Sequence, residues 1–159
     1  MSALAVDASQ GHDLSEEIVR LGVLSEALDA LLERLERMGL TVDVKSAGRG
    51  RVAMMASGLA MMDGDVLFGT RRDLPSALAR GLSPVRALEQ ALGRQGDPAL
   101  GRGMPGAIQD RGLGVVLTDG NVASHVMHAA GFGHAARLRG EQRAALALFG
   151  SAAQASGEL

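Results

Sequence analysis

Two adjacent arginines that follow a threonine are the first residues in the chain whose side chains could do chemistry. Thr70, Arg71 and Arg72 come directly after a short apolar run. Guanidinium groups match the geometry of phosphate oxygens, so these three residues could form an anion site. The alternative is a solvated pair of cations balanced by the neighbouring Asp65 and Asp73.

His125 and His128 are a second candidate because residues three apart share one face of a helix. Such a pair can bind a metal ion, but no carboxylate lies at the spacing that would complete the site. The alternative is a structural role for both rings. The chain has no cysteine, which excludes thiolate chemistry, and it lacks a Gly-x-Ser-x-Gly elbow and a P-loop. Serine hydrolase and nucleotide hydrolase activities therefore have no support.

The composition predicts one globular domain. The 159 residues are 47% apolar, which is enough for a packed core. Only 2% are aromatic and the net charge is -2, so neither stacking platforms nor a basic surface for nucleic acid is expected. No apolar run approaches the roughly 20 residues that span a bilayer, and the N-terminus does not resemble a secretion signal. The absence of cysteine fits a cytoplasmic location.

The elements that must position these residues follow from periodicity. We expect a mobile leader at 1–12, a single domain at 13–150 and a frayed tail at 151–159. Asp13 and Glu16 have the spacing of a capping box, and a leucine seam after them predicts a long helix that packs on another helix or on a partner subunit. Helices are expected at 13–39, 52–62, 75–80, 84–93 and 122–138, and short strands at 66–68, 115–117 and 143–149. The fold class is α/β and helix-rich, with a few short parallel strands and a glycine-rich loop at 94–114.

Several strings in this order resemble one known family. The segment Asp65 to Asp73 is similar to its strand and "Tyr-Arg-Asp" turn, and Gly101 to Gly106 is similar to its "Gly-Arg-Gly-Met-Pro" loop. His128 to Gly140 resembles its buried helix, and Ala145 to Gly150 resembles the strand before its metal motif. The family is the alpha subunit of the thiamin-diphosphate-dependent dehydrogenase component of pyruvate, branched-chain 2-oxo acid and acetoin dehydrogenase complexes.

The resemblance implies an incomplete thiamin-diphosphate-binding fold. In the family this subunit holds the diphosphate and Mg²⁺, a beta subunit faces the aminopyrimidine, and the cofactor carries the oxidative decarboxylation of a 2-oxo acid and acyl transfer to lipoamide. By resemblance, the vestigial cofactor-binding residues would be Thr70, Arg71 and Arg72 on the first turn. The second turn would add Gly120, Val122 and Ser124.

The departures from the family pattern fall at the metal site. Ser151 occupies the position of a carboxylate ligand, and Ala152 replaces a glycine that lets backbone approach the phosphates. The family's second ligand, an asparagine, would lie beyond Leu159. Glu158 could be a substitute ligand, but it is displaced along the chain. No titratable residue follows the 101–106 loop at the place of the family's histidine. We therefore expect no catalytic residue and no metal site in the chain alone.

Three hypotheses follow. The first is a truncated, non-catalytic relative of the alpha subunit, which acts by association with itself or with a beta-like subunit. The second is one half of a split enzyme, in which another chain completes the site for thiamin diphosphate and Mg²⁺. The third is an unrelated small helical interaction protein. The sequence does not predict the substrate, the partner or the oligomer size.

Overall fold

The computed structural model describes residues 8–97 and 99–157. The helices in these ranges are α1 (Ala8–Arg37), η1 (Gly48–Gly50), α2 (Arg51–Leu59), α3 (Leu74–Ala79), α4 (Pro84–Ala91), α5 (Ser124–Arg139) and η2 (Ser151–Ala155), where η marks a 3-10 helix. The strands are β1 (Val66–Thr70), β2 (Gln109–Asp110), β3 (Val115–Thr118) and β4 (Ala145–Ala147). The prediction of a helix-rich α/β fold with short strands is confirmed.

The four strands form one mixed sheet in the order β2-β3-β1-β4. Strand β1 lies at the centre and pairs in parallel with both neighbours, with Leu67 opposite Val115 and Leu146. Strand β2, which was not predicted, pairs antiparallel with β3. The three parallel strands therefore end at the same edge of the sheet, where the residues that follow each strand meet.

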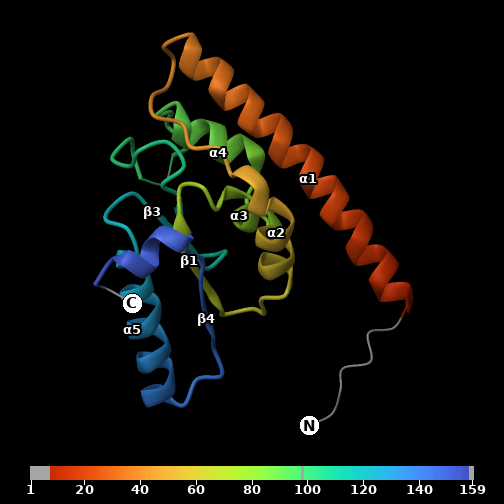
Figure 1. The fold of residues 1–159 in the computed structure, drawn as a ribbon, viewed down its shortest axis with the longest axis vertical. Helices are drawn as coiled ribbons and strands as arrows, with labels where there is room; N and C mark the ends of the chain where they lie inside the picture. Colours follow the sequence, from red (N-terminus) through yellow and green to blue (C-terminus); the bar gives the residue numbers. More distant parts are fainter. Residues whose placement is uncertain (1–7, 98, 158–159) are drawn as a thin grey trace.

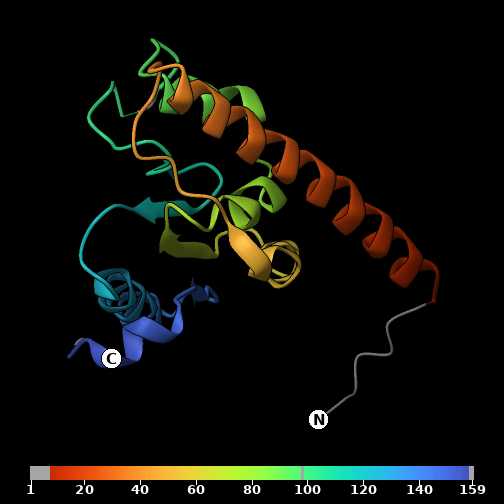
Figure 2. The same cartoon turned by 45° about the horizontal axis from the view of Figure 1, so that its top comes forward.

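The sheet is covered on both faces (Figures 1 and 2). Helix α5 packs on one face against β1 and β4, while α2 and α3 lie on the opposite side, with α4 beside them and α1 across all three. Most of the core lies between the sheet and these helices, and Leu67 and Leu117 of adjacent strands are fully buried in it. Gly58 permits close packing of α2 on α3, because a Cβ there would lie 2.7 Å from the carbonyl oxygen of Ser76.

Helix α1 starts earlier than the capping box predicts. It begins at Ala8, so residues 8–12, which the sequence assigned to a leader, are helical, while residues 1–7 lie outside the described part. The segment 8–12 has no proline to stop the helix, and the Asp13 and Glu16 pair therefore falls inside it. The predicted leucine seam packs within the chain at Leu21 and Leu28, but its member Leu31 is exposed and the neighbouring Leu32 is buried in its place. In the described part of the chain, no helix is long and apolar enough to cross a membrane.

The C-terminal segment also differs from the prediction. Strand β4 covers only Ala145–Ala147 of the expected 143–149, and its residues are half-buried because it lies at an edge of the sheet. The tail expected to fray from residue 151 contains η2, in which Ala153 is buried. Residues 158–159, including the proposed substitute ligand Glu158, lie outside the described residues.

Candidate functional site

A cavity of about 370 Å³ lies where the parallel strands end. Its walls are the turns after β1, β3 and β4, together with Lys45 from the loop before η1. Ligand sites of parallel sheets lie outside the carboxyl ends of the strands, so this is the expected place for a site. The lining residues are Lys45, Thr70, Arg71, Arg72, Thr118, Asp119, Gly120, Asn121, Val122, Ala123, His125, Phe149, Gly150 and Ala153.

The sequence-predicted site residues come together here, with one exception. Thr70, Arg71 and Arg72 line the cavity from the turn after β1, and Gly120 and Val122 line it from the turn after β3. The exception is Ser124, the first residue of α5. Its hydroxyl donates to the carbonyl of Asn121 at 2.9 Å. Ser124 lines an adjacent cavity of about 560 Å³ that also contacts Gly120. The structure thus juxtaposes these residues, and their binding of a cofactor stays a prediction.

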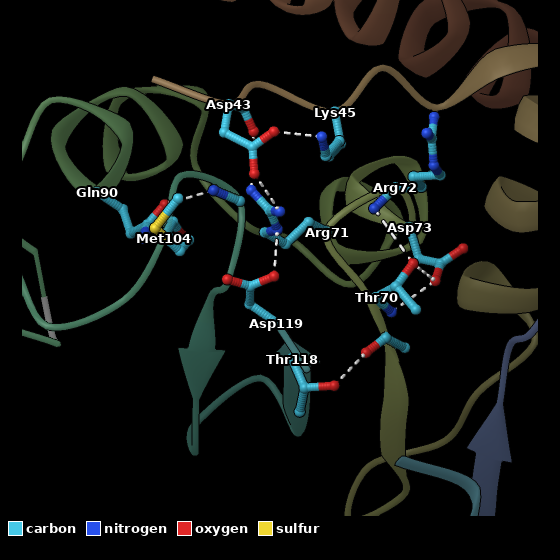
Figure 3. Close-up of polar contacts among 12 residues, drawn as sticks. Asp43, Lys45, Thr70, Arg71, Arg72, Asp73, Gln90, Met104, Thr118 and Asp119 are labelled. Atoms are coloured by element: carbon cyan, nitrogen blue, oxygen red, sulfur yellow. Dashed lines mark hydrogen bonds and ion pairs between the residues drawn. The ribbon is translucent and has the colours of Figure 1, made fainter. Parts of the chain in front are cut away.

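Arg71 is buried and already surrounded by oxygen atoms of the protein (Figure 3). Its Nη1 and Nη2 atoms donate to the carbonyl oxygen and to Oδ2 of Asp43, at 2.8 and 2.7 Å. Its Nε atom lies 2.9 Å from Oδ1 of Asp119, which follows β3. The guanidinium is therefore paired with two carboxylates, and its charge is neutralised within the protein.

Asp43 is the residue that sequence reasoning missed. Lys45 forms an ion pair with its Oδ1 atom, so both carboxylate oxygens face cations (Figure 3). Hydrogen bonds from Lys45, and then from Arg71, lower the pKa of Asp43 to about 2. Its backbone has φ = 51°, a left-handed conformation that is uncommon for a residue with a side chain. Asp43 is 28 residues from Arg71, so no local pattern could have paired them.

Arg72 points away from this cluster (Figure 3). It is exposed, and its Nη1 atom donates to the carbonyl oxygen of Ser46 at 3.1 Å. The alternative interpretation, a solvated arginine pair near Asp65 and Asp73, is therefore wrong for Arg71, which is buried. It agrees with the structure only in that Arg72 is exposed. The backbone amides of Met62 and Ala144, rather than an arginine, donate to the Asp65 carboxylate.

Asp73 fixes the turn after β1. Its Oδ2 atom accepts from the amide of Thr70 at 2.7 Å and from the Thr70 hydroxyl at 2.9 Å. Gly69 makes this approach possible, because a Cβ at that position would lie 2.9 Å from the same oxygen. Burial raises the pKa of Asp73, while the bonds from Thr70 act in the opposite direction.

His125 has a structural contact at the floor of the cavity. The ring is 1% exposed, and Nε2 lies 2.7 Å from the carbonyl oxygen of Leu148. A carbonyl oxygen can only accept, so Nε2 carries a proton, and Nδ1 is buried with no hydrogen-bond partner among the described residues. His128 is exposed and lines the adjacent cavity instead. The described residues contain no cluster of three His, Cys, Asp or Glu side chains that could hold a metal ion.

The glycine-rich loop at 101–106 is held beside this site. The buried side chain of Gln90 accepts from the amide of Gly106 at 2.7 Å and donates to the carbonyl of Met104 at 2.8 Å. Gly106 has φ = 84°, and a Cβ there would lie 3.3 Å from the backbone of Arg71. The loop therefore packs directly on the arginine that pairs with Asp43.

The residues present do not fit a magnesium-bound diphosphate. Mg²⁺ needs oxygen ligands that include one or two carboxylates. Ser151, at the position of the expected carboxylate, is neutral and exposed, and it does not line the cavity. Asp119 does line it, but its Oδ1 atom faces Arg71. No reaction step through this cofactor can be derived from these residues.

Comparisons with known proteins agree with the architecture. The family model described as "Dehydrogenase E1 component" matches residues 16–159. A 2-oxoisovalerate dehydrogenase subunit alpha from Pseudomonas aeruginosa is 32% identical to the chain over 100 residues. That alignment covers 63% of this chain and 24% of the relative, so the chain matches about a quarter of the relative's length.

Proposed function

We propose that the chain, which belongs to the dehydrogenase E1 component family, is an alpha-subunit-like, non-catalytic domain that acts by associating with another protein chain. Its partner would be a beta-like subunit or a second copy of the chain. The third hypothesis, an unrelated helical protein, is wrong because the family model matches residues 16–159.

The observation that carries this proposal is the charge at the ends of the strands. The segment 149–157 after β4 contains no charged residue, although resemblance places a metal-binding carboxylate there. The cation best placed for a diphosphate, Arg71, is neutralised by Asp43 and Asp119. A cavity whose buried guanidinium is paired with two carboxylates, and whose last strand end lacks a carboxylate, stabilises a pyrophosphate and its cation poorly.

An association role is supported by the surface of α1. Its N-terminal half projects beyond the other helices (Figures 1 and 2). Val19 is 65% exposed, Val23 is 66% exposed and Leu14 is 45% exposed, so this half carries apolar side chains into solvent. Apolar residues repeated along one projecting helix favour contact with another helix.

A second candidate function is one half of a split thiamin-diphosphate enzyme acting on a 2-oxo acid. It is favoured by the intact placement of Thr70 and of the 101–106 loop beside the cavity. In that case another chain would supply the metal ligands, and the cofactor would supply the carbanion chemistry. This chain would contribute only positioning groups.

Mixing with a 2-oxoisovalerate dehydrogenase beta subunit tests the association. Light scattering coupled to size-exclusion chromatography should show a complex that weakens with Val19→Glu. Val85→Glu is the matched control, because Val85 is 62% exposed on α4 and the substitution is identical. A chain that stays monomeric alone and with the beta subunit contradicts the proposal. Decarboxylase activity that appears only in the mixture would favour the split enzyme.

A further inference from the structure

A carboxylate of the chain itself lies on the cations at the strand ends. Oδ2 of Asp43 accepts from Arg71, Oδ1 pairs with Lys45, and the carbonyl oxygen of Asp43 accepts a further Arg71 bond. The contacts therefore resemble those that an anionic ligand would make with two cations. Two N–H donors of Arg71 bind Asp43, and its Nε atom forms an ion pair with Asp119.

The segment around Asp43 is anchored on both sides. Before it, the Thr41 hydroxyl donates to the carbonyl of Ala91 at 2.6 Å, and after it the amide of Val44 donates to Glu36 at 2.9 Å. Farther along, the buried Asp29 accepts from the amide of Ala47 at 3.2 Å. These bonds hold Asp43 in a left-handed conformation that its side chain alone would disfavour.

We propose that Asp43 is a specificity-determining residue that excludes polyanions from the strand-end cavity. A diphosphate entering the cavity would have to displace the carboxylate from Arg71 and Lys45, or lie beside it as a like charge. This role of Asp43 rests on the proposed function in one respect: the cavity is taken to correspond to the end of the family's site that holds the diphosphate. It predicts that removal of one carboxylate, with no change to any cation, creates an anion site.

The test is calorimetric titration with inorganic pyrophosphate in the absence of divalent cations. Asp43→Asn and Asp43→Gly both remove the charge, and asparagine and glycine are the residues that best tolerate the left-handed backbone. Asp63→Asn is the matched control, because Asp63 is exposed and does not line the cavity. Both Asp43 variants should bind pyrophosphate at least about tenfold more tightly than Asp63→Asn, since a like charge is removed from the site.

A second substitution assigns the gain to the arginine. In the Asp43→Asn protein, Arg71→Gln should return pyrophosphate binding to the level of the control. Equal binding by Asp43→Asn and Asp63→Asn, or a gain that survives Arg71→Gln, overturns the inference. Wild-type protein that binds metal-free pyrophosphate at about micromolar concentration overturns it even if the variants do not fold. Association with the beta subunit is measured separately, so its failure counts against the proposed function and not against this comparison.

Discussion

Nε of Arg71 lies 2.9 Å from Oδ1 of Asp119, and this ion pair joins the turns that follow β1 and β3. The two strands are parallel neighbours, so the contact closes the sheet at the edge where the cavity lies. Arg71 and Asp119 therefore stabilise the fold through this ion pair. The positive charge of Arg71 is neutralised within the protein and is not available to bind an anionic ligand.

Ala123 is predicted to be a strained residue whose replacement by glycine stabilises the protein. It has φ = 71° at the residue before α5, and its side chain is 1% exposed. A left-handed conformation costs a residue with a Cβ about 1–2 kcal/mol, and part of that is offset by the greater freedom of glycine when unfolded. Urea denaturation should show Ala123→Gly raising the free energy of unfolding by about 0.5–1 kcal/mol.

Ala129→Gly is the matched control for that substitution. Ala129 is also buried, but it lies inside α5 with helical neighbours. Glycine in a helix interior costs about 1 kcal/mol relative to alanine, so this variant should be less stable than wild type. A loss of stability in both variants would contradict the assignment of strain at Ala123.

Gly114 is predicted to be intolerant of any side chain. Its φ is 64°, and a Cβ would lie 2.3 Å from the carbonyl oxygen of Asp65, next to the β1–β3 pairing. Gly93 has φ = 58° with no atom within 4 Å of its Cβ position, so Gly93→Ala measures only the free energy cost of the left-handed backbone. Gly93→Ala should lose about 1 kcal/mol and Gly114→Ala about 3 kcal/mol in urea denaturation. Equal losses would contradict the close approach of the two segments.

Gln90 is predicted to hold the glycine-rich loop. Gln90→Met keeps the volume but leaves the buried bonds to Met104 and Gly106 unmade, which should destabilise the loop by about 2 kcal/mol. Hydrogen-exchange mass spectrometry should show faster exchange in the 99–107 segment and little change in β3. Gln95→Met, at an exposed position, serves as the control. Unchanged exchange of the loop in Gln90→Met would show that other contacts hold it.

Asp73 is predicted to make stability depend on pH. Burial raises its pKa above the usual value of 3.8, so the folded state binds this proton more tightly than the unfolded chain. Its contribution to the free energy of unfolding is therefore fully present below that value and is lost as pH rises through the raised pKa. The Asp73→Asn variant has no carboxyl group at this position, so its free energy of unfolding lacks this dependence on pH.

Unfolding at a series of pH values between about 3 and 7 measures this effect. The unfolding free energy of Asp73→Asn minus that of wild type should increase with pH across the raised pKa. Asp43→Asn should show the opposite slope, because hydrogen bonds lower the pKa of Asp43 to about 2 and its contribution is lost as pH falls toward that value. A difference for Asp73→Asn that stays constant with pH contradicts the raised pKa.

The local pattern of the chain was sufficient to predict most elements. Apolar runs located β1 and β3, and prolines at 75 and 84 located the starts of α3 and α4 to within one residue. The two-residue strand β2 was missed because it is too short to show periodicity. The start of α1 was wrong because a capping sequence is compatible with a helix interior.

The site could be predicted only in part, because its charges are paired over long distances in the chain. Resemblance placed Thr70, Arg71 and Val122 at one cavity, and the structure brings them there. Asp43, one of the two partners of Arg71, lies on a loop that no periodicity marks, and its left-handed backbone conformation has no signal in the sequence. The neutralised state of the site is therefore a property of the tertiary structure.

Thermal unfolding of the wild-type chain with Mg²⁺ and thiamin diphosphate, against Mg²⁺ alone, tests the central claim most directly. A ligand at a hundred times its dissociation constant adds about 2.7 kcal/mol to stability, which would raise the melting temperature by several degrees. We expect no shift for the chain by itself, because the strand-end cavity offers neither a metal-binding carboxylate nor a free Arg71. A shift of that size in the absence of any partner would contradict the proposed non-catalytic role.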